Sequence, residues 1–384
     1  MPTPVSTNNE TDQSSILDRI ITAQEVSHRE NFKPQDVLRQ LLQRLGERER
    51  QVLWRRFGLG GGESETLDSI GKSFHVTRER IRQIERLGVR KLKDDKEAQQ
   101  LLEPVRQVVV EVIEAEGGIV PSDRLLTSLA ELGDVNHNVI NFYLAEMLDD
   151  VVAPVGGDAT SFLLGWRLRT ADVAALETIV SLAQDIITTR GTPLPEEMLG
   201  RELGSANLTT PLGQPLTEGR LALGLLELAR AVRRNTFGEW GLSHWETITP
   251  KRMNDKIYLV LKKYGQPLHF REITKLINEA KFDHKVAYPP TVHNELILDQ
   301  RYVLVGRGIY ALKEWGFAPG VVADVIASLL IAQARPMSRE EIVSEVLKQR
   351  YVKRGTIHLA LTNQQRFTKL PDGRYAVVTA GSST

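Results

Sequence analysis

The sequence contains no cysteine, and it has no long apolar run. The absence of cysteine excludes disulfides, cysteine-based zinc sites and thiol catalysis, and it is typical of proteins from a reducing cytoplasm. No apolar stretch approaches the roughly 18 residues that a membrane span needs. The N-terminal segment is polar and lacks the charged and then apolar order of a signal peptide. We therefore expect a cytoplasmic protein with no membrane partner.

The net charge is also zero, because 49 basic residues balance 49 acidic residues, but the two signs are unevenly distributed. Residues 44–93 carry 13 basic and 7 acidic residues, whereas residues 97–250 carry 10 and 22. The surplus is basic again in residues 251–317 (12 and 7) and in residues 318–378 (9 and 5). Basic segments attract phosphate and acidic ones repel it, so the two ends are the better candidates for contact with nucleic acid. The alternative is that these charges only solvate the surface.

With 384 residues the chain is long enough for two to four domains, and it contains an internal repeat of about 65–70 residues. The ends of the repeats align best, as in Gly238–Trp245 and Gly308–Trp315. Each repeat begins with an apolar helix, such as Val108–Ala115 in the first, and two shorter helices and a β-hairpin follow. The second repeat is the least regular, and its proline-rich stretch Thr192–Pro215 is interpreted as an insertion.

The predicted fold class is therefore mainly α, with a helix-turn-helix domain followed by tandem winged-helix units. The predicted segments are a disordered start at 1–15, a helix-turn-helix head at 16–96, units at 97–170, 171–249, 250–317 and 318–378, and a tail at 379–384.

The spacing of apolar residues predicts the helices of the head. Two helices are expected in residues 16–45, separated by a break at Asn31–Pro34. Further helices are expected at Glu47–Phe57, Leu67–Phe74 and Arg78–Leu92. Thr66 and Thr77 stand where an N-cap is needed. The glycines at 58–62 end a helix and do not form a phosphate loop, because no Gly-Lys-Ser/Thr follows them.

The predicted helix from Arg78 places a set of base-reading side chains on one face. Arg78, Glu79, Arg82 and Gln83 follow the spacing i, i+1, i+4 and i+5, whereas Ile81 and Ile84 lie on the opposite side. Arginine suits the major-groove edge of guanine, glutamine that of adenine, and glutamate can accept from the cytosine amino group. A solvated charged helix is the alternative interpretation.

Three blocks, Arg48–Leu59, Thr66–Gly71 and Val76–Glu85, occur in order, and together they resemble region 4 of the primary bacterial sigma factors, over about residues 38–93. The resemblance implies a bacterial, nucleoid-associated protein whose head binds double-stranded DNA at a promoter −35 element. The implied base-reading residues are Arg78, Glu79, Arg82 and Gln83, and the implied phosphate contacts are Thr66, Leu67 (through its backbone), Thr77, Arg80, Arg90 and Lys91.

The sequence departs from that family at Leu87-Gly88, where lysine and alanine are usual. The long upstream region with which sigma factors bind the polymerase core and melt DNA is not found in the roughly 40 residues before the match. We therefore expect no free-standing sigma factor.

Residues 251–316 resemble the HARE helix-turn-helix family, which is related to the N-terminal domain of the RNA polymerase delta subunit. The motifs that carry this resemblance are His269–Ile273, Pro290–Leu296 and Gly308–Leu312. It implies a winged helix whose recognition helix is Pro290–Leu298. The secondary DNA contacts that we predict are Lys281, Lys285, His293, Lys353 and Arg354. Winged helices also serve as protein-docking modules, which remains the alternative.

The sequence shows no catalytic constellation, and its eight histidines are scattered. We expect no enzymatic activity, no cofactor and no metal. The leading hypothesis is a sequence-specific DNA-binding transcription regulator. The alternatives are an accessory protein that binds the RNA polymerase core, and the DNA-recognition subunit of a restriction or defence system.

Overall fold

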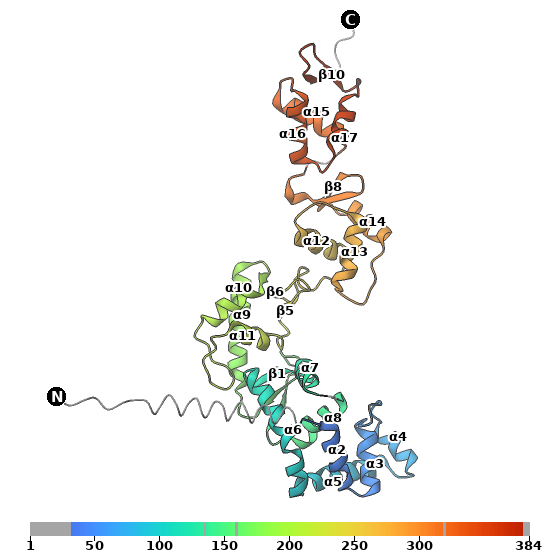
Figure 1. Cartoon of the computed structure of the whole chain (residues 1–384), viewed down its shortest axis with the longest axis vertical. Coiled ribbons are helices and arrows are strands. Elements are labelled where there is room, and N and C mark those ends of the chain that lie inside the picture. Colours follow the sequence, from blue (N-terminus) through green and yellow to red (C-terminus); the bar gives the residue numbers. More distant parts are fainter. Residues whose placement is uncertain (1–31, 134–135, 158–159, 318–319, 379–384) are drawn as a thin grey trace, which may run out of the picture. The chain divides into compact units, whose positions relative to one another are not determined.

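The structure is a computed structural model that describes residues 32–133, 136–157, 160–317 and 320–378. The segment 1–15 that was predicted to be disordered, the helix predicted before Asn31 and the tail at 379–384 lie outside these residues. The chain divides into two compact units, one up to Arg233 and one from Arg234 onward, which are described separately. It is mainly helical with small antiparallel sheets, as expected (Figure 1).

The head of the first unit consists of four helices in the described chain. They are α2 (Pro34–Gln43), α3 (Glu47–Arg56), α4 (Leu67–Ser73) and α5 (Arg78–Asp94). The predicted helices of this region are confirmed to within two residues at each end. Val52, Ile70, Ile81 and Ile84 form the core between α3, α4 and α5, because the apolar positions of each helix recur at helical spacing.

The same order of elements follows the head four times: a long helix, a short strand, two helices and two strands. The first repeat contains α6 (Lys96–Ala115), β1 (Ile119–Pro121), α7 (Ser122–Leu132), α8 (His137–Phe142), the π-helix η1 (Tyr143–Met147), β2 (Val152–Val155) and β3 (Gly165–Leu168). The second contains α9 (Val173–Arg190), β4 (Leu194–Pro195), α10 (Glu196–Gly204), α11 (Gly219–Leu226), β5 (Val232–Arg234) and β6 (Glu239–Leu242).

The remaining two repeats belong to the second unit. The third contains α12 (Met253–Tyr264), β7 (Leu268–His269), α13 (Phe270–Ala280), α14 (Pro289–Leu298), β8 (Tyr302–Gly306), β9 (Ile309–Leu312) and the 3-10 turn η2 (Lys313–Trp315). The fourth contains α15 (Val322–Gln333), α16 (Arg339–Gln349), α17 (Arg354–Leu361), β10 (Phe367–Lys369) and β11 (Tyr375–Val377). Here the isolated bridge between Met337 and Tyr375 takes the place of the short strand.

Two predictions about the repeats are wrong. The stretch Thr192–Pro215 is no insertion, because it contains β4 and α10, the strand and second helix of the repeat. The first helix of the first repeat begins at Lys96, well before Val108. Asp95 caps it by accepting hydrogen bonds from the backbone N–H groups of Glu97 and Ala98, and the helix continues through Pro104.

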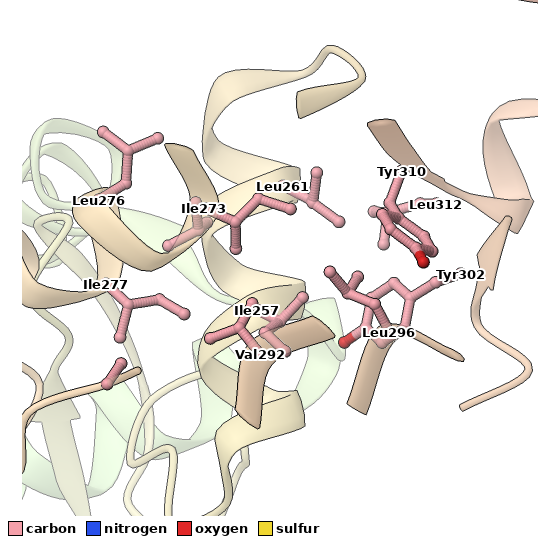
Figure 2. Close-up of a cluster of buried hydrophobic side chains, with 12 residues drawn as sticks. Ile257, Leu261, Ile273, Leu276, Ile277, Val292, Leu296, Tyr302, Tyr310 and Leu312 are labelled. Atoms are coloured by element: carbon pink, nitrogen blue, oxygen red, sulfur yellow. The ribbon is translucent and has the colours of Figure 1, made fainter. Parts of the chain in front are cut away.

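The third repeat shows how each repeat builds its core. Its sheet has the order β7-β9-β8, with antiparallel pairing throughout. Three helices contribute aliphatic side chains, and the hairpin adds Tyr302, Tyr310 and Leu312 (Figure 2). The aliphatic members are Ile257, Val260, Leu261, Ile273, Leu276, Ile277, Val292 and Leu296. One supersecondary unit thus encloses its own hydrophobic core, which is the basis of a tandem arrangement.

Candidate nucleic-acid interface

The turn between α4 and α5 fixes the geometry of the candidate interface. His75 adopts a left-handed conformation (φ 53°), and the backbone N–H of Val76 donates to the carbonyl of Gly71. A Cβ at Gly71 would lie 2.8 Å from the carbonyl oxygen of Val76, so only glycine allows this close approach. The two helices are therefore held as a helix-turn-helix.

The side chains of Arg78, Glu79, Arg82 and Gln83 form one face of α5, which we term the readout face. Arg78, Glu79 and Gln83 are exposed and Arg82 is half-buried, whereas Ile81 and Ile84 are buried beneath them. The structure therefore brings the four predicted base-reading residues together on one solvent-facing stripe.

Two pairs of residues organise the polar groups of α5. Arg82 donates to Glu79 through Nε (2.8 Å) and through a second guanidinium nitrogen, and Arg80 donates to the side-chain oxygen of Gln83 at 3.1 Å. The hydrogen bond from Arg82 holds the pKa of the Glu79 carboxyl below its usual range. Both members of this pair are thus charged at neutral pH, so the face offers donors and an acceptor together.

The predicted phosphate contacts take different positions. The hydroxyls of Thr66 and Thr77 accept from the backbone N–H groups of Ser69 and Arg80, each at 3.2 Å, so both threonines are N-caps. Leu67 begins α4 with a half-buried side chain, which leaves only its backbone N–H for a phosphate.

The basic side chains of α5 that were predicted to contact phosphate also differ from one another. Arg80 and Arg90 are exposed. Lys91 lies round the helix from the readout face, and its Nζ is 2.5 Å from a carboxylate oxygen of Glu49 on α3. The structure thus directs Lys91 toward α3.

Arg86 is a residue that the sequence analysis missed. It is exposed and lies one helical turn beyond Arg82, so it extends the readout face toward Arg90. The signal was available in the sequence, because Arg78, Arg82, Arg86 and Arg90 are spaced by four residues.

The departure at Leu87-Gly88 has a structural reason at one of its two positions. A Cβ at Gly88 would lie 3.3 Å from Cδ1 of Leu53, so the glycine allows α5 to pack closely against α3. Leu87 is 38% exposed on the edge of the readout face, and nothing in the structure explains an apolar residue there.

The first repeat packs directly against the head within the first unit. The rings of Phe57 and Phe142 lie 4.9 Å apart, and the hydroxyl of Tyr143 donates to the carbonyl of Pro34 at 2.8 Å. Burial raises the pKa of Tyr143, so the hydroxyl remains a donor. Lys93 at the end of α5 pairs with Asp149 at 2.7 Å. The helix-turn-helix is therefore supported by residues far along the chain.

The predicted secondary contacts lie in the second unit. Lys281, Lys285, Lys353 and Arg354 are exposed. His293 is half-buried, and its ring packs against the rings of Phe270 (4.6 Å) and Tyr310 (5.8 Å). This histidine therefore belongs to a ring stack inside the repeat.

Comparison with known proteins identifies relatives of the head. The family profile described as "Sigma-70, region 4" matches residues 41–94. A protein named RNA polymerase sigma factor SigA from a Bacillus species is 50% identical over 64 residues, which is 17% of each chain. The protein of the same name from Lactococcus lactis subsp. cremoris is 32% identical over 101 residues, which is 26% of this chain and 28% of its own. The chain thus matches little more than a quarter of these relatives at most.

Within the described ranges, no group of three or more His, Asp or Glu residues could hold a metal ion. None of the helices described there combines the length and apolar character that a membrane crossing requires.

Proposed function

We propose that this protein is a sequence-specific double-stranded DNA-binding protein, and that its head reads a promoter element of the −35 type. The observation that carries the proposal is the readout face, in which Arg78, Glu79, Arg82 and Gln83 stand on a helix held by a glycine turn. Support comes from the sigma region 4 match, which contains all four residues. Each good bidentate contact with a base edge discriminates by about 1–3 kcal/mol.

The phosphate contacts in this proposal come from several parts of the head. Exposed Arg80, Arg86 and Arg90 supply charge, and the free backbone N–H groups at the starts of α4 and α5 supply donors. Such contacts fix the position of a protein on the duplex, whereas base contacts select the sequence.

In the same proposal the four repeats are winged helices, those of residues 250–317 being of the HARE type. Support comes from the recurring order of elements and from the three-stranded antiparallel sheet of the third repeat. The protein regulates transcription without enzymatic activity of its own.

Selection of binding sites from random duplex DNA tests the proposal. Wild-type protein should enrich one short motif, and Arg82→Ala should lose the preference at one base pair or abolish enrichment. Arg167→Ala is the control, because this arginine lies in the first repeat and donates to backbone carbonyls there. Equal enrichment by wild type and Arg82→Ala would contradict the assignment of the readout face.

A second candidate function is an accessory protein of RNA polymerase. It is favoured by the relatives described above, which are named as RNA polymerase sigma factors. Co-purification of the core enzyme with the full chain, in the absence of DNA, would support it. If the core enzyme does not co-purify under those conditions, this second function is excluded and DNA binding is the remaining proposal.

A further inference from the structure

The fourth repeat carries a stretch of chain with positive charge only. Residues 346–371 include six basic residues and no acidic one. Two of these basic residues are paired in the structure, because Lys348 pairs with Glu345 and Arg366 with Asp324. Lys353 and Arg354 are exposed and make no salt bridge within the described chain. They stand at the start of α17, where the helix dipole also favours an anion.

An exposed tyrosine lies within this basic stretch of the sequence. Tyr351 is 57% exposed and stands between Arg350 and Lys353 in the loop that precedes α17. Its backbone approaches the hairpin of the third repeat, since a Cβ on Gly306 would lie 2.9 Å from the carbonyl oxygen of Tyr351. Arg307, the next residue of that hairpin, is exposed and has no salt bridge in the described chain either. An exposed tyrosine thus lies in the loop that precedes Lys353 and Arg354, and the backbone of this loop approaches the hairpin that carries Arg307.

The third repeat has the same combination in the equivalent loop. Tyr288 is 64% exposed and precedes α14, after a loop that contains exposed Lys281, His284 and Lys285. The two loops differ in sequence and length, but each places a tyrosine and basic residues at the start of the third helix of its repeat.

The helices that follow these loops are poorly suited to reading a duplex. The exposed face of α14 consists of Pro290, Thr291, Asn294, Ile297 and Leu298, and none of these side chains is charged. On α17 the most exposed large side chain is Leu359, at 72%. Base edges in the major groove are read mainly by arginine, lysine, asparagine and glutamine, as the readout face of α5 illustrates. Of these residue types the two helices expose only Asn294 and, in the first turn of α17, Arg354, whereas the large apolar side chains Ile297, Leu298 and Leu359 are exposed beside them.

We propose that the loops around Tyr351 and Tyr288 form a binding site for single-stranded nucleic acid. Unpaired bases stack on the two tyrosine rings, while Arg307, Lys353, Arg354, Lys281 and Lys285 contact the phosphates. Stacking suits this surface because every base has a π-face, so an aromatic ring binds unpaired bases with little sequence preference. A duplex keeps its bases stacked on each other and cannot use the rings in this way. The inference does not depend on duplex reading by the head.

This proposal is tested by fluorescence anisotropy with the full chain and a labelled oligothymidine. The strand has about 15 nucleotides, a length within the range of known single-strand binding sites. All variants are compared in an Arg82→Ala background, so that the remaining charge of the head contributes equally to each of them. The Tyr351→Ala and Tyr288→Ala variants should each weaken binding by between about 5-fold and about 100-fold, the range expected for loss of one stacked base. Tyr351→Phe should retain the affinity, because the ring is kept.

Two matched controls separate stacking from charge and from general damage. Tyr264→Ala removes another exposed tyrosine of the second unit, whose neighbours Lys262 and Lys263 already contact the rings of Tyr258 and Phe237, and it should bind like wild type. Because bases stack on both tyrosines, an abasic oligonucleotide of the same length should bind the unchanged loops more weakly than oligothymidine binds either single tyrosine variant.

Equal affinity for the abasic and the thymidine strand would overturn the proposal, and so would tighter binding of a random-sequence duplex than of the single strand. Binding of an acidic protein in place of either strand would also overturn it. Failure of duplex selection by the head would leave the single-strand result unaffected, so the two proposals fail separately.

Discussion

The side-chain nitrogen of Asn138 lies 3.0 Å from the carbonyl oxygen of Gly58, to which it donates a hydrogen bond between residues 80 positions apart. The same nitrogen donates to the carbonyl of Gly62, also at 3.0 Å. Gly58 itself is left-handed (φ 62°), and a Cβ there would lie 2.5 Å from the carbonyl oxygen of Gly62. Through these hydrogen bonds the first repeat stabilises the conformation of the glycine turn between α3 and α4, which is part of the head.

Replacing Asn138 with alanine should therefore destabilise the head. The carbonyls of Gly58 and Gly62 would lose the hydrogen bonds from Asn138, and only that of Gly58 would keep a backbone donor, the N–H of Gly61. We expect a cost of about 1–3 kcal/mol in the free energy of unfolding of the first unit. Chemical denaturation followed through the head, for example by fluorescence of Trp54, measures this change. Asn294→Ala changes an exposed asparagine of the second unit and should leave the same transition in place. A loss of the same size in both variants would contradict the role of Asn138.

The glycine of the helix-turn-helix turn gives a sharper test of the geometry. In Gly71→Ala the new methyl group would lie 2.8 Å from the Val76 carbonyl, so the turn has to open, and we expect a loss of about 2 kcal/mol or more. Gly62→Ala is the matched control, because no atom lies within 4 Å of its added Cβ. The midpoint of thermal unfolding should fall for the first variant and stay nearly constant for the second. Equal midpoints would show that the turn tolerates a side chain.

Much of the head could be predicted from the sequence because its determinants are local. Apolar residues at helical spacing and threonine caps at Thr66 and Thr77 are sufficient to place α4 and α5, and the spacing of Arg78, Glu79, Arg82 and Gln83 is sufficient to place them on one face. Contacts that join distant residues left no such pattern. Nothing in the sequence around Asn138 indicates its hydrogen bond with Gly58, because that contact forms only when the two segments fold together.

The wrong interpretation of residues 192–215 has a similar physical cause. Proline and glycine at 192–215 suggested an insertion, but both prolines flanking Leu194 precede α10, where a proline does not interrupt the helix. Lys91 was assigned to phosphate through the resemblance to sigma region 4, and the structure adds its ion pair with Glu49. His293 was assigned as part of the expected recognition helix Pro290–Leu298, and the structure adds the packing of its ring against Phe270 and Tyr310. Both assignments to DNA stay predictions.

The pair formed by Glu79 and Arg82 predicts a change of specificity without loss of binding. Glu79→Ala removes an acceptor from the readout face and also one negative charge, so affinity for random duplex should rise while discrimination falls. Titrations of random duplex and of the selected motif, each at two salt concentrations, measure both effects. Glu114→Ala removes the same charge from an exposed position on α6 and should affect discrimination little. A lower affinity for random duplex in Glu79→Ala would argue against this explanation.

Glu341 predicts a dependence of the fourth repeat on pH. Its carboxylate accepts from the backbone N–H of Ser338 (2.7 Å) and pairs with Arg335 (2.9 Å), and these interactions lower its pKa to about 2. A carboxyl with a lowered pKa stabilises the folded state fully above its ordinary pKa of 4.5, and this contribution is lost as the pH falls from 4.5 toward 2.

Hydrogen exchange of the α16 amides at pH 7 and pH 3, corrected for the intrinsic rate, measures this effect. Protection should decrease on acidification in the wild type, and the decrease should be smaller in Glu341→Gln. Glu340→Gln, the exposed neighbour, should behave like the wild type. If both variants lost protection to the same extent as the wild type, Glu341 would not be the group that titrates.

Leu87 offers a gain-of-function test of where the duplex lies. This side chain is 38% exposed and lies at the edge of the readout face, one helical turn beyond Gln83. Its exposed neighbours on α5 are Arg86 and Arg90. A cation at this position should meet a phosphate if α5 lies in the major groove. Leu87→Lys should therefore tighten duplex binding, and the slope of log K against log salt should steepen by about one unit.

Leu164→Lys is the matched control, since it adds the same charge at an exposed leucine of the first repeat. It should change the affinity less and leave the salt slope close to that of the wild type, because a distant charge acts through the screened field and not through a phosphate contact. Equal gains in duplex affinity from both substitutions would mean that the affinity depends on the total charge of the protein. That result would contradict the placement of the readout face in the major groove. A gain confined to Leu87→Lys would place the C-terminal half of α5 beside the DNA backbone.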